Sequence, residues 1–141
     1  MRGILHRALS CLAAWCMLVA AQPSEAANIP PAVDEAMQRY VELADALLPT
    51  LSAAQDAKSA EAAAPALQGL LARVYDSRRE LKNIEKLEPD VAEAVRLKYE
   101  AKMRSGWGKV FEHIFRLHRA KCYESIAFFK QFQTLCVLLE K

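Results

Sequence analysis

The sequence predicts an all-α protein: an antiparallel bundle of three long helices plus a shorter C-terminal helix. Apolar residues recur at three- and four-residue spacing through most of the chain, as they do along one face of a helix. No stretch alternates apolar and polar residues in the way that indicates a strand. Prolines and small polar residues divide the periodic region into segments joined by short turns, which favours antiparallel packing.

Residues 1–26 have the pattern of a secretory signal peptide. Two arginines precede an uncharged apolar run at residues 8–21, which is shorter than the roughly 20 residues of a spanning helix. Ser24 and Ala26 supply small side chains at a cleavage site after Ala26, and a cut after Ala21 is the alternative. We therefore expect an exported protein, periplasmic or secreted, that is not an integral membrane protein after cleavage.

The remaining domain, residues 27–141, is nearly neutral but polarised. Without the two arginines and one glutamate of the leader, 17 of the 19 basic and 16 of the 17 acidic residues remain, a net charge of +1. Residues 27–66 hold six acids and two bases, whereas residues 91–141 hold five acids and ten bases. These two parts should attract each other if they pack together.

The first helix is predicted at about 32–53. Pro30 and Pro31 precede a stripe of apolar residues at helical spacing: Val33, Met37, Tyr40, Ala44, Leu47 and Leu48. Pro49 lies inside this segment and is expected to kink the helix or to end its regular part, because proline lacks the backbone donor and clashes with the preceding turn.

The second helix is predicted to follow a turn at residues 55–58, with Ser59 as its N-cap. The segment is rich in alanine, the best helix former. Pro65 should delay its start or bend it. Its apolar stripe consists of Ala63, Leu67, Leu70, Val74, Leu81 and Ile84.

The third helix is predicted to start at Val91, capped by Asp90, and to run to about residue 120. Its apolar stripe passes through Gly106 and Gly108 without losing register, so one long helix is expected, with a local kink left open. A short connection at residues 121–123 should lead to a last helix near 124–139, with Glu124 in its first turn.

Residues 47–71, LLPTLSAAQDAKSAEAAAPALQGLL, resemble the helix-turn-helix of a group of small exported all-helical bacterial proteins of unknown function. The likeness rests on Asp56, Ser59-Ala60 and Ala63-Ala64-Pro65 and implies no activity. Separately, Leu51-Ser52-x-x-Gln55 is similar to the Leu-Thr-x-x-Gln signature of small periplasmic helical chaperones and metal-stress sensors, with Ser in place of Thr and no second copy. This match implies a chaperone-like or metal-responsive helical protein as the alternative function.

Catalytic patterns are missing from the sequence, and we predict no enzyme, no catalytic residues and no cofactor. The four glycines are too isolated for a phosphate-binding loop, and no Gly-x-Ser-x-Gly elbow occurs. Ser77, Ser105 and Ser125 have charged or apolar helical neighbours and are expected to face solvent. Paired carboxylates lie at predicted helix starts, where they favour the helix dipole.

Metal binding is not predicted either. His113 and His118 are five residues apart, which on a helix turns them about 140° from each other. His118 and Cys122 have the favourable i,i+4 spacing and are the candidate ligands, but a closed zinc site needs four. Cys122 and Cys136 are expected to be unpaired within the chain, either buried or linking two chains, because a helix between them would separate them by roughly 18 Å.

A basic stripe is predicted on the third helix. It could hold an anion, but we expect it to face the acidic side of the first helix (Asp34, Glu42, Asp45) or to be solvated. Nucleic acid is not an expected partner, since the protein is predicted to be exported and only moderately basic. The stripe consists of Lys98, Lys102, Lys109 and Arg116.

The C-terminal part of the domain is heavily apolar. Seven of the ten aromatic residues after position 26 lie between Trp107 and Phe132, and the last predicted helix has apolar side chains on every side. The helix either lies within the core or presents a patch to a second copy or to another envelope protein. We therefore predict a non-enzymatic interaction or structural module whose interaction residues are Trp107, Phe111, Phe115, Phe128, Phe129 and Phe132.

Overall fold

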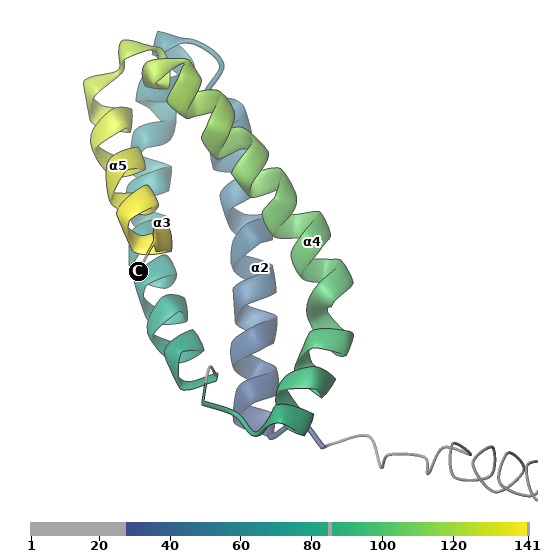
Figure 1. Ribbon diagram of the computed structural model, residues 1–141. Helices are drawn as coiled ribbons and strands as arrows, with labels where there is room; N and C mark the ends of the chain where they lie inside the picture. The colour runs from purple at the N-terminus through teal and green to yellow at the C-terminus, as the bar shows by residue number, and fades with distance from the viewer. Residues whose placement is uncertain (1–27, 85, 141) are drawn as a thin grey trace, which may run out of the picture.

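The computed structural model describes residues 28–84 and 86–140 and is helical almost throughout (Figure 1). Within these residues there is no strand, and the predicted all-α bundle of three long helices and a shorter fourth is confirmed. The predicted signal peptide lies outside the described residues. The helices are α2 (Pro31–Ala53), α3 (Ala57–Ile84), α4 (Pro89–Arg119), a 3-10 turn η1 (Lys121–Glu124) and α5 (Ile126–Glu140).

Two helix starts differ from prediction because other residues cap them. Asp56, not Ser59, caps α3: the Ser59 backbone N–H donates to Asp56 Oδ1 at 2.7 Å, and the Asp56 N–H donates back to Ser59 Oγ at 2.9 Å. This reciprocal capping box starts α3 at Ala57. α4 begins at Pro89, where a proline costs no hydrogen bond, with Glu88 at the N-cap position; Asp90 lies in the first turn, and its Oδ1 accepts from the Val91 N–H at 2.9 Å.

The residues expected to disturb the helices are accommodated inside them. Pro49 lies within α2, which continues to Ala53, and Pro65 lies within α3. Of the two outcomes expected at Pro49, an end of the regular helix is therefore excluded, and the predicted end of the first helix at about residue 53 is confirmed. The expected continuity of α4 through Gly106 and Gly108 is confirmed.

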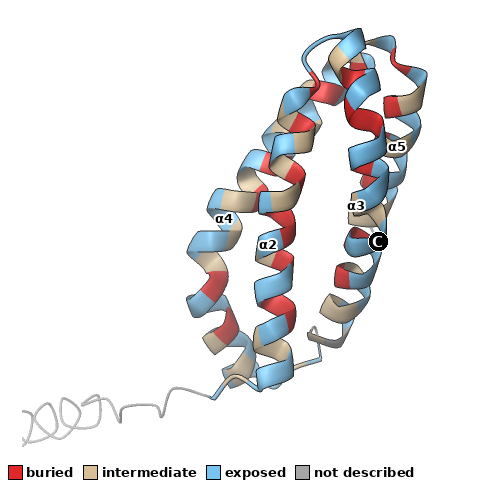
Figure 2. Cartoon of the chain, turned by 180° about the vertical axis from the view of Figure 1, so that it is seen from behind, coloured by how far each residue is buried: buried red, intermediate tan, exposed pale blue. Residues whose placement is uncertain are grey.

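Successive helices run up and down, but the packing partners do not follow chain order. α2 packs on both α3 and α4, while α5 packs chiefly on α3, so the helices form the series α4–α2–α3–α5 (Figures 1 and 2). Along the contact between α2 and α4, residues later in α2 pair with residues later in α4, so these two neighbouring helices run parallel. These pairs are Asp34 with Lys98, Tyr40 with Trp107, and Leu51 with Arg116.

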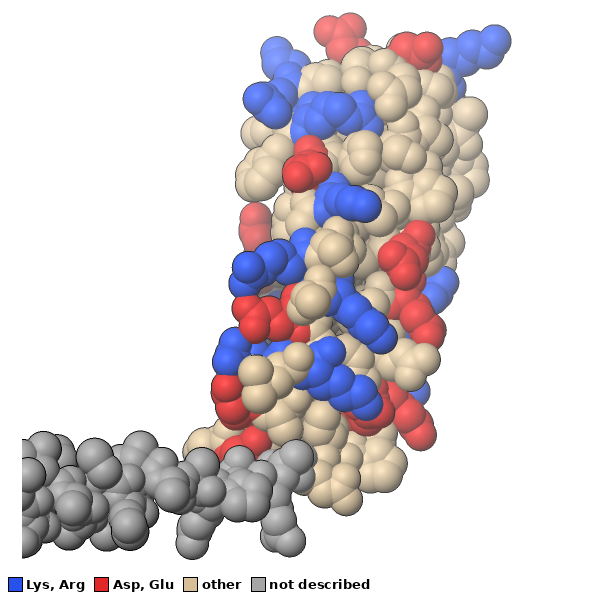
Figure 3. Space-filling model, turned by 90° about the vertical axis from the view of Figure 1, so that its right-hand side faces the viewer, with Lys and Arg blue, Asp and Glu red and all other residues tan. Residues whose placement is uncertain are grey.

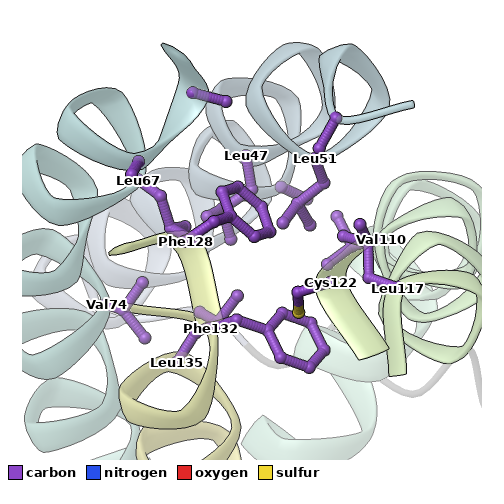
Figure 4. Close-up of a cluster of buried hydrophobic side chains, with 14 of the residues drawn as sticks. Leu47, Leu51, Leu67, Val74, Val110, Leu117, Cys122, Phe128, Phe132 and Leu135 are labelled. Carbon is purple, nitrogen blue, oxygen red and sulfur yellow. The ribbon is translucent and has the colours of Figure 1, made fainter. Parts of the chain in front are cut away.

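The main core lies at the end of the bundle that carries α5 (Figure 4). Every helix contributes to it, and Phe128 of α5 is completely buried. Burial of one such side chain stabilises the fold by about 1.5–3 kcal/mol. A smaller cluster of Met37, Val95 and Tyr99 closes the opposite end. The labelled core residues are Leu47, Leu51, Leu67, Val74, Val110, Leu117, Cys122, Phe128, Phe132 and Leu135.

The contact between α2 and α4 is close because one residue lacks a side chain. A Cβ atom at Gly106 would lie 3.3 Å from Cβ of Ala44, which is fully buried. Next to this point the rings of Tyr40 and Trp107 stack with centroids 4.4 Å apart, and Trp107 Nε1 donates to the Tyr40 carbonyl at 3.1 Å. Gly106 therefore permits the approach that the stacked pair requires.

Arg116 of α4 closes the carboxyl end of α2. The last turn of α2 contains no basic residue, and its carbonyl groups have no partners within the helix. The Arg116 guanidinium donates to the carbonyl oxygens of Leu51 and Ala54, each at 2.8 Å, and to the Tyr123 hydroxyl at 2.8 Å. One side chain thus joins α2, α4 and the connection to α5.

That connection has an unusual backbone. Lys121, Cys122, Tyr123 and Glu124 all have positive φ, from 48° to 63°, a conformation that costs a residue with a Cβ roughly 1–2 kcal/mol. The predicted start of the last helix at Glu124 is wrong because this left-handed turn occupies the position. α5 instead begins at Ile126, and Ser125 Oγ accepts from the Phe128 N–H at 3.3 Å as its cap.

The two helical glycines of α4 should respond differently to alanine. Gly108→Ala should raise the free energy of unfolding by about 1 kcal/mol, since alanine favours the helix and no atom lies within 4 Å of the added Cβ. Gly106→Ala should leave the free energy of unfolding unchanged or lower it, because the added methyl group presses on Ala44. Urea denaturation of both variants tests this, and an equal gain in both would contradict the close contact.

The left-handed turn predicts a stabilising glycine. Lys121→Gly should raise the free energy of unfolding by about 1 kcal/mol, since Lys121 is exposed and glycine adopts positive φ without strain. Ala101→Gly, at an exposed position inside α4, is the control and should lower it by about 1 kcal/mol. If both glycines destabilise the protein equally in urea denaturation, the turn carries no strain.

Candidate functional site

The six aromatic residues predicted for interaction divide equally between core and surface. Trp107, Phe128 and Phe132 are buried, each at most 3% exposed, and they build the core described above. Phe111, Phe115 and Phe129 are exposed. Trp107, Phe128 and Phe132 therefore expose almost no surface to a partner, although Phe132 lines part of the grooves described next.

The exposed aromatics belong to one apolar surface, which we call the α4–α5 face. It consists of Phe115, Ile126, Phe129 and Val137, together with Phe111, which lies one turn before Phe115 on the same side of α4 and lines a neighbouring groove beside Trp107. A groove of about 850 Å³ runs between the two helices, lined by Phe115 from α4 and by Phe129 and Val137 from α5. A second groove of about 690 Å³, lined by Ile126 and Phe129, shares His118 and Phe132 with the first.

Two residues of this face, Ile126 and Val137, were missed by the sequence prediction of interaction residues. Both lie on an apolar helix that has hydrophobic side chains on every side, so periodicity alone could not separate buried from exposed positions. The packing of α5 on α3 makes that choice, because it directs Phe128, Phe132 and Leu135 inward.

The candidate metal ligands His118 and Cys122 line the smaller groove. Cys122 is fully buried, and burial raises the pKa of its thiol to about 11. The thiol therefore stays protonated at neutral pH, whereas a metal binds the thiolate. Among the described residues no three His, Cys, Asp or Glu side chains come together in a cluster that could hold a metal ion.

The two cysteines of the described chain are both free thiols. Cys122 lies in the core beside Phe132, which matches the expected buried position (Figure 4). Cys136 is partly exposed and lines the larger groove.

The prediction that the serines face solvent is wrong for two of the three. Ser77 and Ser125 are buried, at 9% and 5% exposure, and Ser105 is exposed. Ser125 Oγ donates to Glu61 Oε2 at 2.6 Å while it caps α5, so it joins the first turns of α3 and α5. A structural role thus accounts for its burial.

The basic stripe of α4 lies partly against the acidic side of α2, as expected. Lys98 Nζ contacts Asp34 Oδ1 at 2.7 Å, and the Tyr99 hydroxyl donates to the same oxygen at 2.7 Å. Lys102 lines a polar groove of about 460 Å³ together with Glu42 and Asp45. The fourth member of the stripe, Arg116, binds backbone carbonyls instead, and charges of both signs intermingle on this side of the molecule (Figure 3).

The Asp34 contacts predict an effect of pH. Hydrogen bonds from Lys98 and then from Tyr99 hold the pKa of Asp34 below its ordinary value of 3.8. The carboxylate therefore stabilises the fold above the unfolded-state pKa, and this contribution is lost as pH falls through the lower folded-state pKa.

Asp34→Asn should therefore lower the free energy of unfolding at pH 7 and reduce its dependence on pH below about 4. Urea denaturation at a series of pH values measures both effects. Asp45→Asn is the matched control. Asp45 lies on the same helix, and its carboxylate takes part in no ion pair of the described residues. Identical pH profiles for the two variants would contradict a special role of Asp34.

Comparison of the chain with protein-family models, with curated proteins and with solved structures found no match. Within the described residues no helix combines the length and the apolar character needed to cross a membrane.

Proposed function

We propose that this protein is a non-enzymatic interaction module that binds another protein surface through the α4–α5 face. The observation that carries the proposal is the distribution of exposed apolar side chains. Among the described residues seven large hydrophobic side chains are exposed; five of them belong to this one face, and the other two, Tyr75 and Leu97, lie elsewhere. An apolar surface gathered in this way is typical of interaction sites, whereas single exposed residues are common on any protein.

The shape of the face favours a protein partner. Grooves of about 690 and 850 Å³ run beside side chains that project outward, since Phe115 is 64% and Ile126 is 85% exposed. A small apolar ligand in a groove would leave these projecting side chains in water. A second protein surface covers ridges and grooves together, as helix-in-groove contacts do.

The charges near the face also support docking. All ion pairs of the described residues lie between positions 34 and 104. The charged groups around the α4–α5 face come later in the chain, so they have no ion-pair partner among the described residues. A polar rim around an apolar centre is the usual arrangement of a protein interface.

Site-specific photo-cross-linking tests the proposal. A benzophenone amino acid replaces Phe115, or in the control Leu97, in cells that express the full chain. The two positions are equally exposed, at 64% and 67%, and are 18 residues apart on α4, which places them on the same side of the helix roughly 27 Å apart. The label at position 115 should give protein adducts, and the label at 97 should not.

The pattern of adducts decides between functions. Bands of discrete mass from position 115 support an interaction module, while a broad ladder of many proteins would favour the chaperone-like alternative. Equal adduct yields from both positions, or none from either, would overturn the proposal, because the α4–α5 face would then contact other proteins no more than any exposed apolar residue does.

A further inference from the structure

We propose that the partner bound by the α4–α5 face is a second copy of this chain, held by antiparallel packing of α5 against α5. This inference rests on the proposed function and names its partner. Three features of the described residues carry it: the symmetry of the exposed side of α5, the charges along its rim, and the apolar area that the face leaves uncovered.

Two exposed apolar residues of α5 lie symmetrically on either side of Gln133. Phe129 precedes Gln133 by four residues and Val137 follows it by four, and all three are exposed. A two-fold axis at Gln133 would place Phe129 of one copy on Val137 of the other, and the reverse, while the two Gln133 amides meet. Such reciprocal pairing is what a two-fold interface demands.

The charges on the rim of the groove agree with this arrangement. Lys130 and Glu140 both line the larger groove, and neither takes part in an ion pair of the described residues. In the antiparallel pair, Lys130 lies within about one helical turn, roughly 6 Å, of the second copy's Glu140. A lysine side chain spans that distance, so each end of the interface gains an opposite charge.

The apolar area is also of the size that a dimer needs. Complete aromatic side chains present about 150–250 Å² each, so the exposed fractions of the five residues of the face leave on the order of 500 Å² of apolar surface if the second copy covers Phe111 and Phe115 of α4 as well as α5. Standard interfaces bury about 800 Å² per partner, of which about 65% is apolar in homodimers. The two values correspond, and the area is at the upper end for a face that stays uncovered.

Sedimentation velocity of the protein, purified after expression of the full chain, tests the pairing. The wild type should sediment as a dimer, and Phe129→Lys and Val137→Asp should each weaken dimerisation by about tenfold or more. Mixing these two variants should restore a dimer. In the mixed pair the introduced lysine meets the introduced aspartate at one contact, and the original Phe129 and Val137 meet at the other.

The control is Leu97→Asp, an equally exposed apolar residue of α4 outside the face, which should remain dimeric. Restoration on mixing also shows that both variants are folded. A wild type that is monomeric up to about 100 µM, or two variants that stay monomeric when mixed, would overturn the proposal. If position 115 still cross-links to a different protein in that case, the interaction module stands and only the identity of its partner is wrong.

Discussion

The hydrogen bonds of Arg116 organise one end of this protein. The carboxyl end of α2 is covered by α4, and its carbonyl oxygens at Leu51 and Ala54 would lose their water without gaining a partner. The guanidinium supplies two directed donors there and a third to Tyr123. Because leaving a buried acceptor unpaired costs about 1–3 kcal/mol, this contact fixes how far α4 can move along α2. It also fixes where the chain leaves α4.

The course of the chain after α4 follows from that anchor. Tyr123 is held by Arg116, and Cys122 is buried in the core, so residues 121–124 adopt the left-handed backbone that reaches both positions. The turn directs α5 onto α3, and the Ser125–Glu61 hydrogen bond joins the start of α5 to α3. α5 thereby fills the core with one side. Its other side and the neighbouring side of α4 remain uncovered, which creates the α4–α5 face.

The sequence predicted the helices well and their caps less well. Periodic apolar residues span many turns, so errors at single positions do not hide a helix. Capping depends on which of several polar residues reaches a backbone donor. Asp56 and Ser59 are both good N-caps, and in the structure they cap each other, with Asp56 just before the helix and Ser59 inside it. Similarly, three of the six aromatics predicted for interaction are in the core, because aromatic content alone does not show which side of a helix is covered.

The sequence by itself determined the helical class, the four helices, the continuity of α4 and the polarity of charge, since these depend on local propensity and on residue spacing. Tertiary structure alone decided which helices are neighbours. The absence of a side chain at Gly106 beside Ala44, together with the reach of Arg116, allows α2 and α4 to pack closely as neighbours, although they are not consecutive in the chain. The left-handed turn then determines which side of α5 is exposed. Both choices depend on contacts between residues more than 60 positions apart or on a strained backbone, which no local pattern encodes.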